Sequence, residues 1–152
     1  MQDPVVRTIV VPCSAATAFA VFTRDMTKWW PLASNTVSAM TGTVARGVTM
    51  EEKLGGAVVE IAGDGSRLVW GKVTDWQPGR ALAFDWHAGD TPDRATHVKV
   101  AFADREGGAR VTLTHSGWEV LGEQAQGARN GYDQGWVNVF DVSYAAACRK
   151  AA

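Results

Sequence analysis

Residues 70–86 read WGKVTDWQPGRALAFDW, with runs of alternating apolar and polar residues on either side of a central Pro-Gly. Alternation with a period of two around such a turn is typical of a β-hairpin. Facing residues of an antiparallel hairpin have position numbers with a constant sum, so closing Gln77 against Arg80 places Val73 opposite Phe84. This pairing gives the hairpin one apolar face, which another layer of the protein must cover.

The same alternation extends outward from this hairpin, from about Val44 to Ser116. Turn residues divide the region at Gly55-Gly56, Gly63-Asp64-Gly65, Pro78-Gly79, Gly89-Asp90-Thr91-Pro92 and Glu106-Gly107-Gly108. The pattern predicts six consecutive antiparallel strands, and Val5–Val11 adds a seventh. Closing the last hairpin with Asp104 against Ala109 predicts three facing pairs, which are Phe102 with Val111, Val100 with Leu113 and Val98 with His115.

Two short helices are expected after the first strand and one long helix at the C-terminus. Ser14 is a suitable N-cap for a helix that ends near Thr23, and Trp29-Trp30-Pro31 predicts a short second helix or turn. The last helix carries Tyr132, Trp136, Val139, Phe140 and Ala147 on one face. The sequence therefore predicts an α+β fold in which a curved seven-stranded antiparallel sheet wraps around the C-terminal helix.

One helix cannot fill the concave face of such a sheet, so we expect a mainly apolar pocket between them. The residues expected to bind a ligand there are Trp30, Glu60, Val73, Phe84, Trp86, Val98, Val100, Leu113, His115, Tyr132, Trp136 and Phe140.

Composition limits the classes of function. The 152 residues fit a single domain, residues 1–152, and the formal net charge is -1 without a Lys/Arg stripe, which argues against a nucleic-acid partner. No run approaches the ~20 apolar residues of a membrane span. The first residues lack a secretory signal, and Cys13 and Cys148 are expected to be free thiols. We therefore expect a cytoplasmic protein without a membrane role.

Glu51 and Glu60 are candidate catalytic residues. Counting the register back through the glycine turns places Glu60 beside Val69 on the inner face and Glu51 opposite Glu60. Two facing carboxylates in an apolar concavity could act as acid and base or hold a polar ligand group. In the alternative interpretation, the edge hairpin twists away and both carboxylates stay in solvent, paired with Lys53 or Arg46.

His115 is the third candidate, because it ends the inner row of the last strand. It could act as a base or ligand donor, or form a structural hydrogen bond at the cavity rim. His87 and His97 fall on the outer face in the predicted register, so the three histidines do not converge. We therefore expect no metal site, and no cofactor.

Two further patterns leave alternatives open. Trp70 and Trp76 fall on the outer face, so either they form a homodimer surface or a bulge returns them to the core. Gly127, Gly131 and Gly135 recur every fourth residue; we expect Gly127 in a loop before the helix and Gly135 making room at the pocket mouth.

A family resemblance follows from residues 70–86 together with 111–117 and Gly135-Trp136. These segments resemble the START-like (SRPBCC) superfamily and, within it, the family named after the activator of Hsp90 ATPase. Val10-Val11-Pro12 and Trp29-Trp30-Pro31 resemble the family's opening, so the likeness spans nearly the whole chain. It implies the helix-grip fold with a hydrophobic cavity. It does not imply co-chaperone activity, and the family shows no universal catalytic motif to transfer.

The leading hypothesis is a protein that binds a small hydrophobic or aromatic molecule. The alternative is an enzyme of the hydrolase, cyclase or lyase type that acts on such a molecule through Glu51, Glu60 and His115. A weaker alternative is a stress protein associated with an Hsp90-type chaperone. The sequence favours binding without catalysis and identifies neither the ligand nor the oligomeric state.

Overall fold

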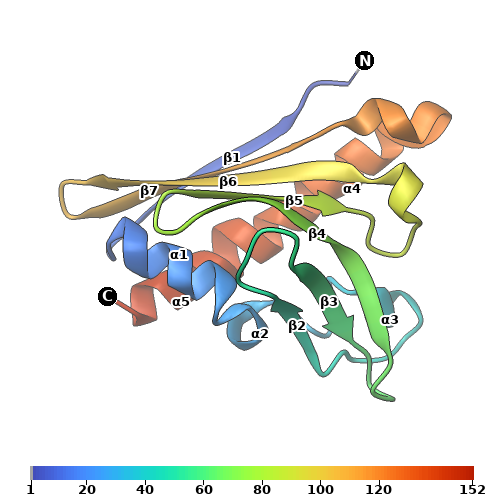
Figure 1. Ribbon diagram of the computed structural model, residues 1–152, viewed down its shortest axis with the longest axis horizontal. Helices are drawn as coiled ribbons and strands as arrows, with labels where there is room; N and C mark the ends of the chain where they lie inside the picture. Colours follow the sequence, from blue (N-terminus) through green and yellow to red (C-terminus); the bar gives the residue numbers. More distant parts are fainter. Residues whose placement is uncertain (1) are drawn as a thin grey trace.

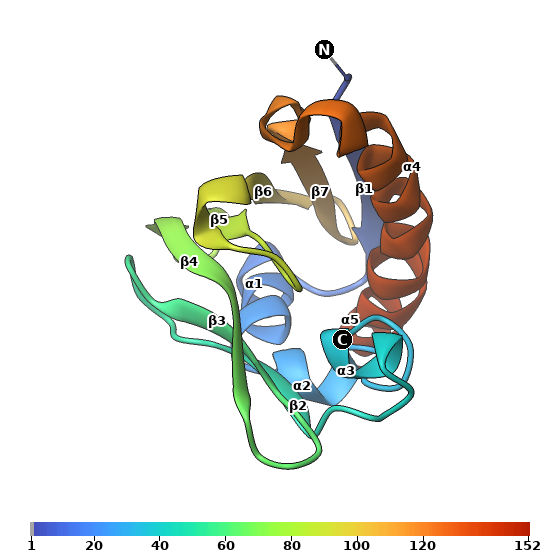
Figure 2. The ribbon, with the colours of Figure 1, turned by 90° about the vertical axis from the view of Figure 1, so that its right-hand side faces the viewer.

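The computed structural model describes residues 2–152 and contains one seven-stranded antiparallel sheet with the strand order β1-β7-β6-β5-β4-β3-β2. The strands are β1 (Val5–Val11), β2 (Gly47–Met50), β3 (Ala57–Ile61), β4 (Arg67–Gln77), β5 (Ala81–Trp86), β6 (Thr96–Arg105) and β7 (Gly108–Ser116). Figures 1 and 2 show the sheet curling around the helices, with the C-terminal helix along one side. The predicted α+β helix-grip architecture is confirmed.

The helical elements are α1 (Ala15–Thr23), α2 (Met26–Trp29), α3 (Val37–Met40), η1 (Pro92–Arg94), η2 (Trp118–Gln124), α4 (Ala125–Trp136), η3 (Val137–Tyr144) and α5 (Ala145–Lys150). Ser14 caps α1 as predicted, since its hydroxyl accepts a hydrogen bond from Thr17 N at 3.1 Å. The last three elements form one continuous helical run, in which η3 has π-helical hydrogen bonding. Gly127 lies inside α4, so its expected place in a loop is wrong.

The predicted register holds for the last hairpin, where Phe102 faces Val111, Val100 faces Leu113 and Val98 faces His115. Val73 also faces Phe84, as predicted. Closer to the turn, however, Gln77 pairs with Ala81 and not with Arg80. A bulge between Val73 and Asp75 shifts the register by one residue, which a constant-sum count does not foresee.

A second bulge interrupts the pairing of β3 with β4 at Trp70, because Val58 faces Gly71 whereas Val59 faces Val69. Glu60 consequently faces Leu68 rather than Val69. The bulges also decide where two tryptophans point. Trp70 is only 1% exposed, and Trp76 packs edge-on against Phe19 at 5.0 Å between ring centroids. Of the two alternatives, the bulge is therefore the correct one, and these indoles do not supply an outer surface for a dimer.

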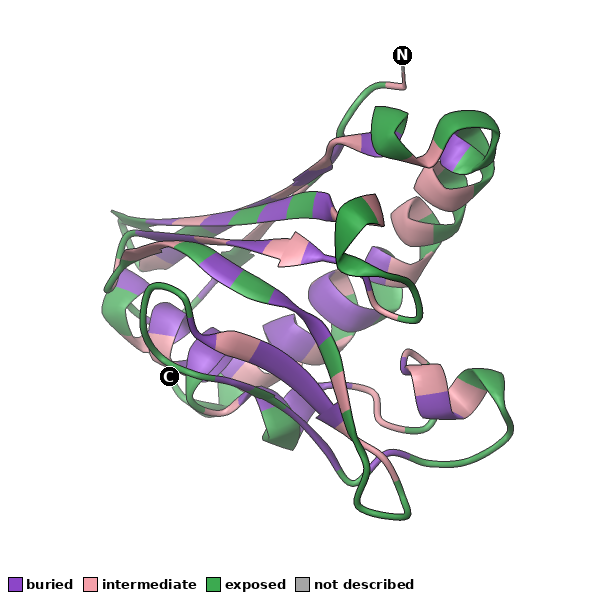
Figure 3. Cartoon of the chain, turned by 45° about the vertical axis from the view of Figure 1, so that its right-hand side comes forward, coloured by how far each residue is buried: buried purple, intermediate pink, exposed green. Residues whose placement is uncertain are grey.

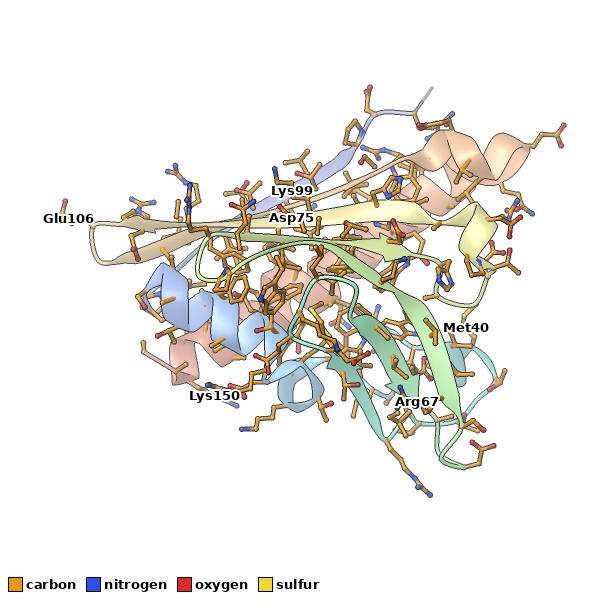
Figure 4. All side chains as sticks on the ribbon, viewed as in Figure 1. Met40, Arg67, Asp75, Lys99, Glu106 and Lys150 are labelled. Atoms are coloured by element: carbon orange, nitrogen blue, oxygen red, sulfur yellow. The ribbon has the colours of Figure 1, made fainter. Side chains whose placement is uncertain are left out.

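The core lies between the concave face of the sheet and the helices. Burial alternates along the strands in Figure 3, as expected for a sheet with one covered face. Lys99 on β6 points away from the helices, and Glu106 marks the tip of the β6–β7 hairpin (Figure 4). Six of the residues expected to line a pocket are at most 1% exposed and belong to this packed core: Val73, Phe84, Val98, Val100, Leu113 and Phe140.

Candidate functional site

A pocket of about 320 Å³ opens where the C-terminal helix passes β4 and β5, on the side of α3. Its lining residues are Trp30, Ser34, Asn35, Thr36, Val37, Met40, Trp70, Trp86, Ala88, Ala128, Gly131, Tyr132, Gly135, Trp136 and Val139. Four of the residues that the sequence predicts for ligand binding are among them: Trp30, Trp86, Tyr132 and Trp136. Met40, labelled in Figure 4, is exposed and therefore lies at the rim of the pocket.

Aromatic rings form the wall of this pocket. Trp86 lies centrally, with its ring centroid 5.1 Å from Trp70, 5.6 Å from Trp136 and 5.9 Å from Tyr132. Trp30 stacks on Trp86 at 6.1 Å. Pro31 keeps Trp30 in an extended conformation at the end of α2, and the Trp30 indole donates to Asn35 O at 2.8 Å. The rings are therefore held in place before any ligand arrives.

His115 supports this wall from beneath and lies outside the lining. The Trp136 indole donates to His115 Nδ1 at 3.0 Å, so that nitrogen carries no proton. The proton is then on Nε2, which lies 2.7 Å from Thr96 Oγ1, and Thr96 in turn donates to Trp86 O at 3.2 Å. Burial lowers the pKa of His115 to about 3, so the ring is neutral at physiological pH. Both nitrogens are occupied, and the geometry gives His115 the structural role.

Glu60 is fully buried on the inner face of β3 and binds the first turn of α3. Its carboxylate accepts hydrogen bonds from Val37 N at 2.8 Å, Ser38 N at 2.9 Å and the Ser38 hydroxyl. The Trp70 indole donates to the same carboxylate at 3.2 Å. Glu60 therefore holds α3 at the pocket rim and orients the Trp70 ring. Each of its two carboxylate oxygens already accepts two hydrogen bonds, and Glu60 is not among the residues that line the pocket.

The expected facing of Glu51 and Glu60 is wrong. Val48 is the residue opposite Glu60, because β2 ends at Met50 and residues 51–56 form a loop rather than a tight turn. Glu51 lies in this loop, more than half exposed, where it accepts from Ala57 N at 2.9 Å and lies 4.0 Å from Lys53 Nζ. The alternative interpretation of a solvated carboxylate near Lys53 is correct for Glu51, whereas Glu60 is buried.

The other histidines do not form a metal site. His97 is exposed and lies 3.1 Å from Asp85, whereas His87 is buried, contrary to its predicted outward position. His87 follows β5, which ends at Trp86, so the alternation of the strand no longer fixes the direction of its side chain, although its N still donates to Trp70 O. Within residues 2–152 no three His, Cys, Asp or Glu side chains cluster as metal ligands would. Helices in the same range are too short or too polar to cross a bilayer.

Sequence reasoning missed the contribution of the segment that contains α3. Ser34, Asn35, Thr36, Val37 and Met40 all line the pocket, and none was expected to. One local signal was available, since Thr36 is a suitable N-cap and does accept from Ala39 N at 3.0 Å. A helix of four residues carries no apolar periodicity, however, so its position could not be inferred from the sequence.

The comparisons with known proteins agree with this geometry. The model of the family described as activator of Hsp90 ATPase homolog 1-like proteins matches residues 12–142. The chain belongs to this family. The predicted resemblance is thus confirmed, and with it the START-like fold. No curated protein sequence matches this family member significantly.

Solved structures with the same fold cover nearly the whole chain of this family member. An anthrahydroquino-γ-pyrone synthase, Txn09, solved in complex with SUM, is 26% identical, with a TM-score of 0.64 over 99% of this chain and 97% of its own. CalC from Micromonospora echinospora, a self-sacrificing resistance protein, is 23% identical, with a TM-score of 0.68 over 97% and 94%. MLL2253 from Mesorhizobium loti is 13% identical, with a TM-score of 0.68 over 99% of both chains.

Proposed function

We propose that this protein binds a small, flat, mainly apolar molecule in the pocket between β4, β5, α3 and the C-terminal helix. The observation that carries the proposal is the wall of prepositioned rings, Trp30, Trp86, Tyr132 and Trp136, around a volume of about 320 Å³. Binding sites for small molecules fall in the range of about 300–1,000 Å³ and are lined mainly by apolar and aromatic groups. Flat π faces favour an aromatic occupant, which can stack on them.

Two glycines on α4 keep this volume open. Gly131 and Gly135 line the pocket, whereas Gly127, one turn earlier on the same helix, lies outside its lining. A Cβ atom at Gly127 or Gly131 would meet no heavy atom within 4 Å. A larger side chain at either position is therefore compatible with the fold, but only the one at Gly131 enters the pocket. The chain thus offers a matched pair of variants.

The test is a thermal-shift screen of flat lipophilic compounds, with hits followed on Gly131→Leu and Gly127→Leu. A ligand at 100 times its Kd stabilises the native state by about 2.7 kcal/mol, which is a measurable rise in Tm. We expect Gly131→Leu to fold and lose the shift, while Gly127→Leu keeps it. Native mass spectrometry of the freshly purified protein provides an independent search for a retained molecule. Absence of any stabilising compound, or equal shifts in both variants, would contradict binding in this pocket.

A synthase-type activity on the bound molecule is the second candidate, and the similarity to the Txn09 synthase favours it. The acid–base groups expected from the sequence have other roles, because Glu51 lies in solvent and Glu60 and His115 are hydrogen-bonded within the fold. Tyr132 is the titratable side chain on the pocket wall. Incubating an identified ligand with the wild-type protein and with Tyr132→Phe, followed by mass spectrometry of the small molecule, tests this; an unchanged ligand rejects catalysis.

A chaperone-associated stress function is the weakest candidate, and it rests on the family's description alone. Pull-down with an Hsp90 middle domain is its direct test, and a blank result ends it. The cytoplasmic location expected from the sequence is tested separately by cell fractionation.

A further inference from the structure

A second, smaller pocket of about 140 Å³ adjoins the aromatic pocket. The two share Trp86, Ala88, Ala128 and Tyr132 in their linings, so they meet at the Trp86 and Tyr132 rings. The rest of the smaller pocket differs in character, because most of its remaining lining is polar: His87, Asp90, Arg94, Thr96, Leu121 and Gln124. A molecule that stacks in the aromatic pocket can therefore place a polar substituent in the smaller one.

Two nitrogen atoms of the smaller pocket's lining residues are buried without a hydrogen-bond partner in residues 2–152, namely Trp86 Nε1 and His87 Nδ1. Trp86 is 6% exposed and His87 9% exposed. Most buried polar atoms in folded proteins have partners, so an occupant that supplies one is favoured here. Because an indole N–H can only donate, the atom that satisfies Trp86 must be a hydrogen-bond acceptor.

The Tyr132 hydroxyl brings a second donor to the same place. Burial raises the pKa of this phenol, so it is protonated at neutral pH, and the nearby Trp86 indole opposes that shift only in part. The Trp86 indole thus lies close to the Tyr132 hydroxyl, yet Trp86 Nε1 has no hydrogen-bond partner within residues 2–152. Both residues line the smaller pocket, so an acceptor there that lies beside both groups could take a hydrogen bond from each.

Asp90 and Arg94 decide the charge of that acceptor. Arg94 Nε donates to Asp90 Oδ2 at 2.9 Å, and this hydrogen bond lowers the pKa of Asp90, which is therefore ionised. Arg94 also donates to Gln124. The guanidinium is thus matched by a carboxylate in the same pocket lining, so this pair adds no net positive charge that would attract an anion. A neutral carbonyl oxygen fits this pocket better than a carboxylate.

We propose that the smaller pocket is a polar subsite that receives a carbonyl oxygen of the flat molecule held in the aromatic pocket, with Trp86 Nε1–H and the Tyr132 hydroxyl as donors. His87 Nδ1 is a third donor in the tautomer that carries its proton there. This inference rests on the proposed binding function and narrows the ligand class to flat aromatic molecules that carry a neutral carbonyl group.

Xanthone and xanthene test it, because these tricyclic molecules differ by one carbonyl group. Equilibrium dialysis with chromatographic detection gives a Kd for each. An entirely apolar pocket would prefer xanthene, the more hydrophobic of the two. We expect the reverse, with xanthone bound about tenfold more tightly, the ratio that one to two net hydrogen bonds supply. Trp86→Phe and Tyr132→Phe should each reduce this ratio to about two- or threefold, and xanthene affinity should change less than xanthone affinity.

Trp118→Phe is the matched control. Trp118 Nε1 is also buried without a partner, but Trp118 lies outside both pockets, so this variant should keep the tenfold ratio. A general loosening of the fold would weaken both ligands alike and leave the ratio unchanged. Equal binding of the two ligands to the wild type, or a ratio that survives both pocket variants, overturns the polar subsite while the binding function stands. Binding of neither ligand counts against the binding function itself, and the subsite falls with it.

Discussion

The two ends of the concave sheet are both rich in aromatic rings, but within residues 2–152 only one of them has a pocket lined by strand residues. At the end near the β6–β7 hairpin tip, α1 inserts two phenylalanine rings. Phe19 packs against Phe102 and Phe22 packs against Tyr144, each at 5.2 Å between ring centroids. At the other end the rings of Trp30, Trp86 and Trp136 surround the pocket. Figure 1 shows α1 beneath the first end and α3 beside the second.

The difference lies in the elements that face the rings. Helix α1 has nine residues, is tied to the hairpin by a hydrogen bond from Ala15 N to Asp104 at 2.8 Å, and fills the first end with side chains. At the second end, α4 presents Ala128, Gly131 and Gly135, and α3 has only four residues. The pocket is therefore a consequence of small residues on the helix rather than of the aromatic wall itself.

Phe22→Ala should have the largest effect, because it makes the filled end hollow. Phe22 is fully buried among Trp29, Phe102 and Tyr144, so the substitution should lower the free energy of unfolding by about 3–5 kcal/mol. Urea denaturation measures this loss of stability. The control is Met40→Ala at the exposed rim, which should change the free energy of unfolding by about 0.5 kcal/mol or less. A loss below 1 kcal/mol for Phe22→Ala would mean that the two ends are packed alike.

Glu60→Gln should release the rim of the hollow end. The new amide group has one oxygen and one NH₂ group, so one of the backbone N–H groups of Val37 and Ser38 would lose its acceptor. Leaving such a buried group unpaired costs about 1–3 kcal/mol. Hydrogen exchange of the Val37 and Ser38 amides should become faster, whereas the amides of α1 should not change. Glu51→Gln is the matched control, because Glu51 lies in solvent. If the exchange rates of the Val37 and Ser38 amides do not change, Glu60 does not position this rim.

Mild acid should lower the free energy of unfolding through His115, which supports the hollow end. Its pKa is lowered to about 3 in the folded state, against about 6.5 in the unfolded chain, so acid protonates the unfolded state first. The stability from the neutral ring is complete above pH 6.5 and is lost as the pH falls toward 3. Between pH 6.5 and 5 the loss should be about 1.5 kcal/mol.

Urea denaturation at these two pH values checks the loss for the wild type and for two histidine variants. His115→Phe should lack the slope, although it is less stable at pH 7 because Trp136 and Thr96 lose their partner. The exposed control His97→Gln should keep the slope. A wild type with no loss over this range would show that His115 is not held neutral.

The sequence predicted the fold and the register of the last hairpin, because Glu106-Gly107-Gly108 fixes its turn and the apolar residues then pair as expected. It offered a bulge near Trp70 and Trp76 only as one of two alternatives and fixed neither the position at Trp70 nor the one at Thr74, since a single extra residue leaves the alternation readable on either side. The pairing of Glu60 with Leu68 and the inward position of Trp70 both follow from one bulge. Long-range geometry of this kind is set by twist and packing, not by local pattern.

The candidate site was predicted less well, for two physical reasons. Inward-facing residues such as Phe84, Val100 and Leu113 were expected in the lining, but the helices cover them fully. The side chains that do line the pocket from α3 are held there by Glu60, a contact across more than twenty residues that no local motif announces. Of the four predicted rings that do line the pocket, Trp30 and Trp86 lie at the ends of α2 and β5, and Tyr132 and Trp136 lie on the face of α4 that the helical spacing predicts.

Gly131→Ala should have the smallest effect and the opposite sign, because it begins to fill the hollow end. A Cβ at this position would meet no heavy atom within 4 Å, and alanine is favoured over glycine inside a helix by about 1 kcal/mol. Gly127→Ala on the same helix should give the same gain, since its surroundings are equally open. Urea denaturation of the two variants therefore isolates helix propensity, and ligand affinity separates them, because only Gly131→Ala narrows the pocket. A loss of stability in Gly131→Ala alone would mean that its methyl group contacts the aromatic wall, so that the hollow end is tighter than its open glycine positions indicate.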